Sequence, residues 1–226
     1  MSARRSTEEL VARLADTLVP VRPISSLRRQ GIAVALAWGA SAAIAAVWLS
    51  LHPLNTIARG PVSAAVFGAL SLIGAAGVLL GLASRIPGRE DVARAAAIGA
   101  ALGAVVLLGL AWALPRPVVG AVTLEECRNC FARSLILAIP SGLLAASLAR
   151  HGAPWRPRTA GIALALGASS LGALLIHASC PSPSAAHWLM AHALLPLPTG
   201  ASVGLLVAWR LDRRAPRARR ALALDA

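Results

Sequence analysis

The sequence predicts an all-α membrane protein, a bundle of six transmembrane helices. Hydrophobic residues make up 57% of the chain, and the mean hydropathy is +0.70, which is too apolar for a soluble globular domain. These residues fall into six runs, each near the ~20 residues that a helix needs to cross a bilayer. The runs cover residues 31–51, 62–84, 95–114, 131–149, 160–178 and 188–209. The connections between them are short, which favours antiparallel neighbours packed as three hairpins.

The leader, residues 1–30, precedes the first span and has the pattern of a short amphipathic helix. Ser6 stands three residues before Glu9, which is the spacing of a capping box. The helix would carry one apolar stripe at helical spacing, formed by Leu10, Val11, Leu14 and Leu18. Pro20 and Pro23 would end it. Because so short a helix is marginal in water, we expect its stripe to lie on the membrane domain or the bilayer surface, or to dock a cytoplasmic protein.

The arginines predict the orientation of the chain. All 22 basic residues are arginine, and eighteen lie in the leader, the second and fourth connections and the basic tail, residues 210–226. The other side holds only Arg59, Arg116, Arg128 and Arg133. Cytoplasmic loops carry an excess of basic residues, so both termini of the chain are predicted to lie in the cytoplasm, with the six-span domain, residues 31–209, between them. The net charge of +13 then reflects topology and contact with lipid, and direct nucleic-acid binding is not expected.

The composition of the spans disfavours several classes of function. The six runs contain no Asp, Glu or Lys. Charged residues inside a membrane usually mark ion paths, proton relays or substrate sites, so a pump or coupled transporter is disfavoured. The chain also has no phosphate-binding glycine loop, no two-histidine metalloprotease pattern and no Gly-x-Ser-x-Gly. We therefore predict no catalytic residue and no enzyme.

Small residues four apart recur in the spans and predict close helix packing. They are Gly77 with Gly81, Gly99 with Gly103, and Gly200 with Gly204. Such spacing lets two helix backbones approach each other. In a chain this rich in alanine, we expect contacts within one molecule rather than a dimer face, and the oligomeric state stays open.

Three cysteines gather on the predicted outer side. Cys127 and Cys130 form a Cys-x-x-Cys in the third connection, and Cys180 follows the fifth span, with His177 and His187 toward the same face. Thiolates at this spacing chelate soft metals or form redox pairs. Four interpretations stay open: a disulfide from Cys127 or Cys130 to Cys180, a redox or thiol sensor, a metal site of the cysteines with His177 or His187, and disulfide exchange by a membrane thiol oxidoreductase. No cofactor is expected apart from such a metal ion.

Over most of its length the chain resembles the NrsF-type membrane anti-sigma factors, a bacterial family of six-span proteins that sequester extracytoplasmic-function sigma factors. One matching stretch is the end of the leader, Leu18-Val19-Pro20-Val21-Arg22-Pro23-Ile24. Another is Ala149-Arg150-His151-Gly152-Ala153-Pro154, ahead of the fifth span. The outer cysteines also match: Cys127 or Cys130 precedes the fourth span, and Cys180 follows the fifth.

The resemblance implies a mechanism. The leader would bind the sigma factor and hold it away from RNA polymerase. The residues implied in this contact are Leu10, Val11, Leu14, Leu18, Pro20, Val21, Arg22 and Pro23. The outer cysteines would detect oxidative or heavy-metal stress. Which sigma factor is bound, which stimulus acts, and whether release follows a conformational change or proteolysis stay open.

Overall fold

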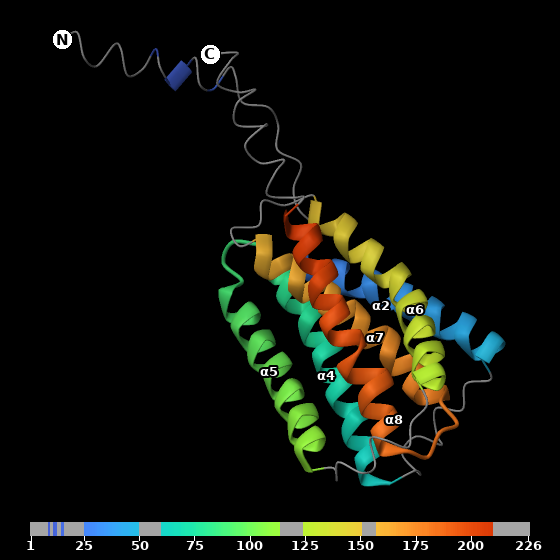
Figure 1. The fold of residues 1–226 in the computed structure, drawn as a ribbon. Helices are drawn as coiled ribbons and strands as arrows, with labels where there is room; N and C mark the ends of the chain where they lie inside the picture. The colour runs from blue at the N-terminus through green and yellow to red at the C-terminus, as the bar shows by residue number, and fades with distance from the viewer. Residues whose placement is uncertain are drawn as a thin grey trace.

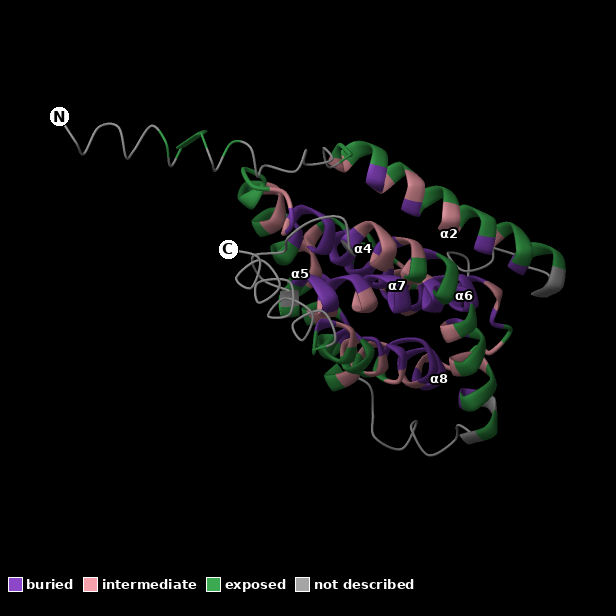
Figure 2. Ribbon diagram, turned by 90° about the horizontal axis from the view of Figure 1, so that it is seen from above, coloured by how far each residue is buried: buried purple, intermediate pink, exposed green. Residues whose placement is uncertain are grey.

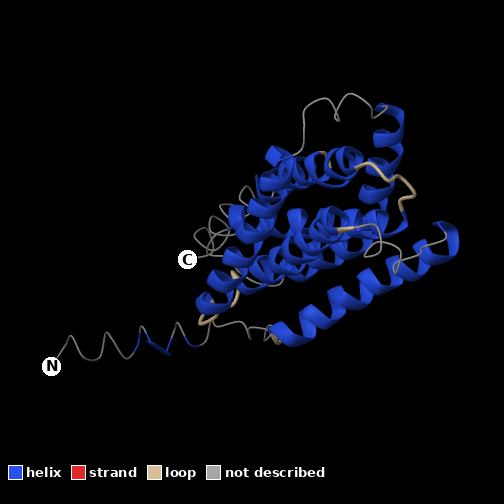
Figure 3. Cartoon of the chain, turned by 90° about the horizontal axis from the view of Figure 1, so that it is seen from below, coloured by secondary structure: helices blue, strands red, loops and turns tan. Residues whose placement is uncertain are grey.

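The computed structural model describes residues 9, 11–12, 15, 25–49, 60–113, 124–150 and 157–209. In this part of the chain every regular element is a helix and no strand occurs (Figure 3). Six helices are long and apolar enough to cross a membrane, which confirms the six predicted spans. Figure 1 shows that they form one elongated bundle.

Five spans are single helices and the sixth is composite. The single helices are α2 (Leu27–Leu49), α4 (Pro61–Ala83), α5 (Glu90–Ala113), α6 (Leu124–Arg150) and α7 (Pro157–Ser179). The sixth span starts with α8 (Ala185–Leu189), widens into a π-helical turn, η2 (Met190–Leu194), and continues as a helix over residues 196–209. One prediction was wrong: α6 begins at Leu124 instead of residue 131, so Cys127 and Cys130 lie in its first turns and not in a loop. Acidic Glu125 and Glu126 favour a helix start there.

The most buried span is α7, which lies at the centre of the bundle. It packs against α4, α6 and η2, and 72% of its apolar stretch is buried, compared with 17% for α5 (Figure 2). The consecutive helices α4 and α5 pair, as do α6 and α7. However, α2 packs mainly on α6 rather than on α4, so the arrangement as three hairpins is not confirmed.

Glycines bring the helix backbones into direct contact, as their spacing predicts. A Cβ added at Gly77 would lie 2.8 Å from the carbonyl oxygen of Ala163, and one at Gly167 would lie 2.7 Å from the backbone nitrogen of Val78. Both distances are shorter than real Cβ contacts, so α4 and α7 touch through their main chains. The other predicted glycines also face a neighbouring helix, namely Gly81, Gly99, Gly103, Gly200 and Gly204. The small residues therefore serve packing within one chain.

Two contacts between different spans mark one end of the bundle. Arg85, in the turn between α4 and α5, donates from Nη2 to Oε1 of Gln30 in the first turn of α2, at 3.5 Å. Near the end of the last helix, Ala208 lies against Gly161 at the start of α7. We call this the Arg85 end, formed by residues 25–30, 84–89, 157–161 and 205–209.

Candidate functional site

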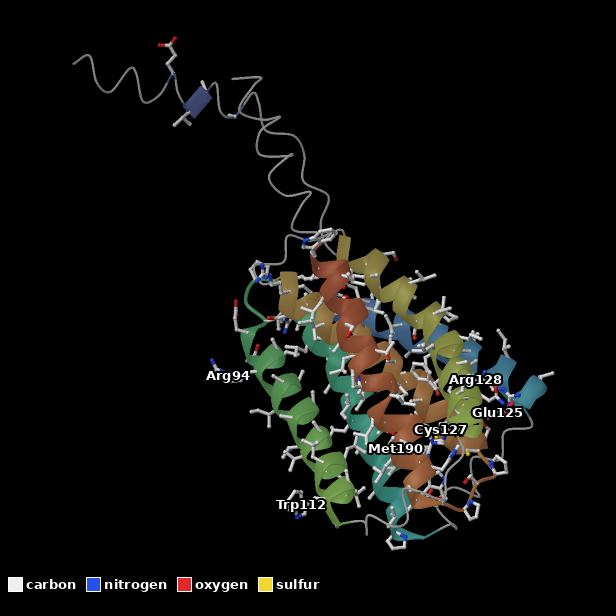
Figure 4. All side chains as sticks on the ribbon, viewed as in Figure 1. Arg94, Trp112, Glu125, Cys127, Arg128 and Met190 are labelled. Carbon is white, nitrogen blue, oxygen red and sulfur yellow. The ribbon has the colours of Figure 1, made fainter. Side chains whose placement is uncertain are left out.

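The opposite end of the bundle holds a cluster of thiols and imidazoles. We call it the cysteine end, formed by residues 60–63, 127–134 and 176–192. Here Sγ of Cys130, Sγ of Cys180 and one ring nitrogen each of His187 and His192 all lie within 4.8 Å of one another. Cys130 is half-buried and the other three are buried. Figure 4 labels Cys127 on α6 and Met190 at the start of η2, the two elements that meet at this cluster.

The π turn explains how two histidines five residues apart share one face. Side chains five apart point about 140° away from each other around an α-helix. Pro196 has no N–H and would clash with the carbonyl of His192 in a regular α-helix. The chain instead widens, and the N–H of Leu195 donates to the carbonyl of Met190 at 3.1 Å. His187 and His192 then lie together, with ring centroids 5.3 Å apart.

A chain of hydrogen bonds holds His192 in place. Nδ1 of His177 lies 3.0 Å from Nδ1 of His192. On the other side of the same ring, Nε2 of His177 lies 3.1 Å from the carbonyl oxygen of Ser63 and 3.2 Å from its Oγ. All three residues are fully buried. His177 therefore ties η2 to the first turn of α4 and acts as a support for His192.

The connection from α7 to α8 is fixed by local contacts. Nε1 of Trp188 donates to the carbonyl of Ser182 at 2.8 Å, and the Trp188 ring packs edge-on against His177, with centroids 5.6 Å apart. Ser184 caps α8, and its Oγ accepts from the N–H of His187 at 3.4 Å. The segment that carries Cys180 and His187 is thus pre-organised around the cluster.

The thiols of Cys130 and Cys180 lie side by side. The N–H of Cys180 donates to the carbonyl of Ile176 at 2.8 Å, so Cys180 continues the last turn of α7. The Cys130 thiol donates a hydrogen bond to the Cys180 sulfur and, together with His192, holds the pKa of the Cys180 thiol below its usual range. A thiolate stabilised in this way is both a metal ligand and a nucleophile.

The structure brings together some of the predicted sensor residues and not others. Cys130, Cys180 and His187 belong to the cluster, whereas Cys127 and His177 are not among its members in the described part of the chain. Cys127 is buried one turn earlier on α6. All three cysteines are thiols, and Cys130 is the one whose sulfur lies beside that of Cys180.

Sequence reasoning missed His192 and Ser63. His192 stands five residues after His187, a spacing that places it on a different face of a regular helix. The signal that could have revealed it is the proline at 196, which favours a widened turn. Ser63 contributes a backbone carbonyl, and a backbone group leaves no sequence signal.

Within residues 1–24 of the leader, the structure describes Glu9, Val11, Ala12 and Ala15, all with helical backbone. Val11 is 60% exposed. The other leader residues predicted to contact a partner lie outside the described residues: Leu10, Leu14, Leu18, Pro20, Val21, Arg22 and Pro23.

Comparison with known proteins identifies the family. The model of the family NrsF, described as negative regulator of sigma F, matches residues 14–213. The chain belongs to this family. No curated protein and no solved structure matches it. The NrsF match includes all six spans and the whole Cys/His cluster. The family name points to a negative regulator of a sigma factor.

Proposed function

We propose that this NrsF protein is an anti-sigma factor of the bacterial inner membrane. It holds an extracytoplasmic-function sigma factor through its leader, residues 1–30, and releases it when the cysteine end is oxidised or binds a metal. The family match over residues 14–213 carries the proposal. It covers all six apolar spans, so a family of sigma-factor regulators is matched by a chain that can lie in a membrane. Tethering a sigma factor to the membrane keeps it from RNA polymerase.

The distribution of arginine supports cytoplasmic termini. Two described arginines, Arg128 and Arg133, lie toward the cysteine end. Six others lie at or next to the Arg85 end: Arg28, Arg29, Arg85, Arg89, Arg94 and Arg158. The positive-inside rule then assigns the Arg85 end to the cytoplasm and the cysteine end to the periplasm. The periplasm is a compartment in which thiols are exposed to oxidants and metals.

The leader offers a surface for a helix-in-groove contact. Glu9, Val11, Ala12 and Ala15 are helical, and the apolar side chain of Val11 is exposed. An amphipathic helix of this kind binds a partner by laying its apolar stripe into a hydrophobic groove. Leu10, Leu14 and Leu18 complete the stripe in the sequence, so the leader has the chemistry of a docking segment.

The central position of α7 supports communication between the two ends. Cys180 directly follows α7, and the other end of α7 lies against Ala208 at the Arg85 end. Because α4 and α7 touch through their backbones, a displacement of α7 at Cys180 would also press on α4, which leads into the turn that carries Arg85. Modification of the cysteine end would in this way change how the leader is presented.

The alternative function, a membrane thiol oxidoreductase, needs two communicating redox pairs. The cluster contains one adjacent pair, Cys130 with Cys180, and the chain has only one further cysteine. No observation favours this function over the regulator. Turnover of a reduced thiol substrate by the purified protein would support it.

Capture of the partner tests the proposal. The full-length protein is purified from its native membranes, and co-purifying proteins are identified by mass spectrometry. A sigma factor is expected with the wild type and with Ala12→Asp, because Ala12 lies opposite the apolar stripe. Leu14→Asp places a charge in the stripe and should lower recovery at least about tenfold. Equal recovery with Leu14→Asp, or no sigma factor with the wild type, would contradict the proposal.

A further inference from the structure

We propose that Cys130, Cys180, His187 and His192 form a tetrahedral binding site for a thiophilic divalent cation of the Zn²⁺ and Cd²⁺ class. The site lies at the cysteine end and deepens the proposed sensing function. It rests on that function only for what metal binding would signal, since binding itself needs no sigma factor.

The donor set and its spacing fit such an ion. Two sulfurs and two ring nitrogens lie within 4.8 Å of one another. In a tetrahedral zinc site, with Zn–S near 2.3 Å and Zn–N near 2.1 Å, neighbouring donors are about 3.3–3.8 Å apart. The separations between the four donor atoms therefore need to shorten by about 1 Å for them to surround an ion. Because the cluster contains no carboxylate, the hard ions Mg²⁺ and Ca²⁺ are disfavoured.

His187 is the second, independent sign of a ligand. Its side chain is only 2% exposed, and neither Nδ1 nor Nε2 has a hydrogen-bond partner in the described part of the chain. A buried polar group without a partner costs roughly 1–3 kcal/mol. The imidazole nonetheless faces the two thiols and His192, so a cation among them would give one of its nitrogens a partner.

The electrostatics also favour a divalent cation. Two thiolates neutralise a charge of +2, and each thiol that still carries its proton releases it to solvent when the ion binds. Without a cation, two ionised thiols side by side in a buried site repel each other. The ion thus allows both sulfurs to ionise in a region from which water is largely excluded.

Hydrogen bonds select the form of His192 that a metal requires. The carbonyl of Ser63 can only accept, so Nε2 of His177 carries the proton and donates to it. A neutral His177 then presents the lone pair of Nδ1, and Nδ1–H of His192 donates to it. In neutral His192 this arrangement leaves the lone pair on Nε2, the atom that would bind the ion. His177 is therefore a positioning residue and not a ligand.

Cobalt binding tests the site on the full-length protein in detergent, reduced and stripped with a chelator. Co²⁺ gives a thiolate charge-transfer band and intense visible bands when it sits in a tetrahedral site. We expect one Co²⁺ per chain, displaced by Zn²⁺ or Cd²⁺. Cys130→Ser and Cys180→Ser should abolish the charge-transfer band. Cys127→Ser is the matched control, since Cys127 is on the same helix but outside the cluster, and should bind as the wild type does.

Histidine variants separate the four-ligand site from a simple pair of thiols. His187→Ala and His192→Ala should weaken Co²⁺ binding and reduce the tetrahedral visible bands. His177→Phe should weaken binding about 10- to 100-fold with an unchanged charge-transfer band. His177→Asn, whose Oδ1 can accept from His192, should recover part of the affinity. Ser63→Ala keeps the carbonyl and should bind normally.

A further test uses the wild type alone, so a misfolded variant cannot affect its result. Zn²⁺ should slow alkylation of Cys130 and Cys180, and a chelator should restore it, with labelled residues identified by mass spectrometry. The proposal is overturned if the wild type binds no Co²⁺, if Cys127→Ser loses binding as Cys130→Ser does, or if both histidine variants match the wild type. Sigma-factor capture is measured separately, so a protein that captures without binding metal refutes this site and leaves the anti-sigma function intact.

Discussion

The two ends of the bundle bury polar groups in different surroundings. At the cysteine end, side chains from α6, α7, α8 and η2 converge, and His177 joins His192 to the carbonyl of Ser63 through bonds of 3.0 and 3.1 Å. His187 has no hydrogen-bond partner for its ring in the described residues, but it lies beside the other donors of the cluster. At the Arg85 end, a guanidinium that is 2% exposed makes one long bond, 3.5 Å to Gln30. Its Nε and Nη1 have no hydrogen-bond partner in the described residues. Burial removes water from the Arg85 guanidinium and so lowers its pKa.

This difference suggests which end is fixed and which is adjustable. The hydrogen bonds of His177 favour one geometry at the cysteine end, and they leave His187 facing the other donors of the cluster. A buried charge with few partners costs free energy in the present geometry, so alternative arrangements are close in free energy. Arg85 also borders a cavity of about 540 Å³ beside Glu90 and Arg94. Gln30 in turn donates from Nε2 to the carbonyl of Ser25, which also belongs to the leader, at 2.7 Å.

Overpacking of the contact between α4 and α7 should cause the largest loss of stability. Gly167→Ala forces a methyl group within 2.7 Å of the Val78 nitrogen and 2.9 Å of the Gly74 carbonyl oxygen, so α4 and α7 must separate. We expect a loss of about 3 kcal/mol in the free energy of unfolding, measured by denaturant titration in mixed micelles. Gly109→Ala, which meets nothing within 4 Å, is the control and should be neutral. Equal stability of the two variants would show that this contact does not join the ends.

Removing the buried charge should stabilise the Arg85 end. Arg85→Met keeps the length of the side chain and removes the poorly partnered guanidinium, so the free energy of unfolding should rise by about 1–2 kcal/mol. Arg94→Met changes an exposed arginine of the same cavity and should have little effect. A marked loss of stability in Arg85→Met would mean that the guanidinium is well solvated, and the contrast between the ends would not hold.

A smaller loss of stability is expected when a hydrogen bond between α2 and α7 is removed. Nε1 of Trp38 on α2 donates to the carbonyl of Leu171 on α7 at 3.1 Å. Trp38→Phe removes this bond and should cost about 1 kcal/mol in the same unfolding assay. Trp112→Phe is the control, because Trp112 is 89% exposed at the end of α5 (Figure 4). If both variants unfold alike, α2 is not held to α7 through this bond.

The spans were predictable from the sequence, whereas the cluster was only partly so. Runs of apolar residues report the thickness of the bilayer, and four-residue glycine spacing reports close packing, so both predictions are confirmed by the helices and their contacts. The pairing of α2 with α6 depends on the fit of whole surfaces, which no local pattern reports. His192 belongs to the cluster because the π turn rotates its side chain toward His187. His177, which the sequence predicted as a possible ligand, is instead hydrogen-bonded to Ser63.

The most direct test of the account is release of a bound sigma factor from the membrane-embedded protein when Cd²⁺ is added. The complex is captured in nanodiscs, and the bound sigma factor and the intact regulator are both quantified before and after addition. The account predicts release from the wild type and from Cys127→Ser, with the regulator uncleaved, and retention by Cys130→Ser and Cys180→Ser. Retention by the wild type, or equal release from all four proteins, would contradict control of the leader by the cysteine end.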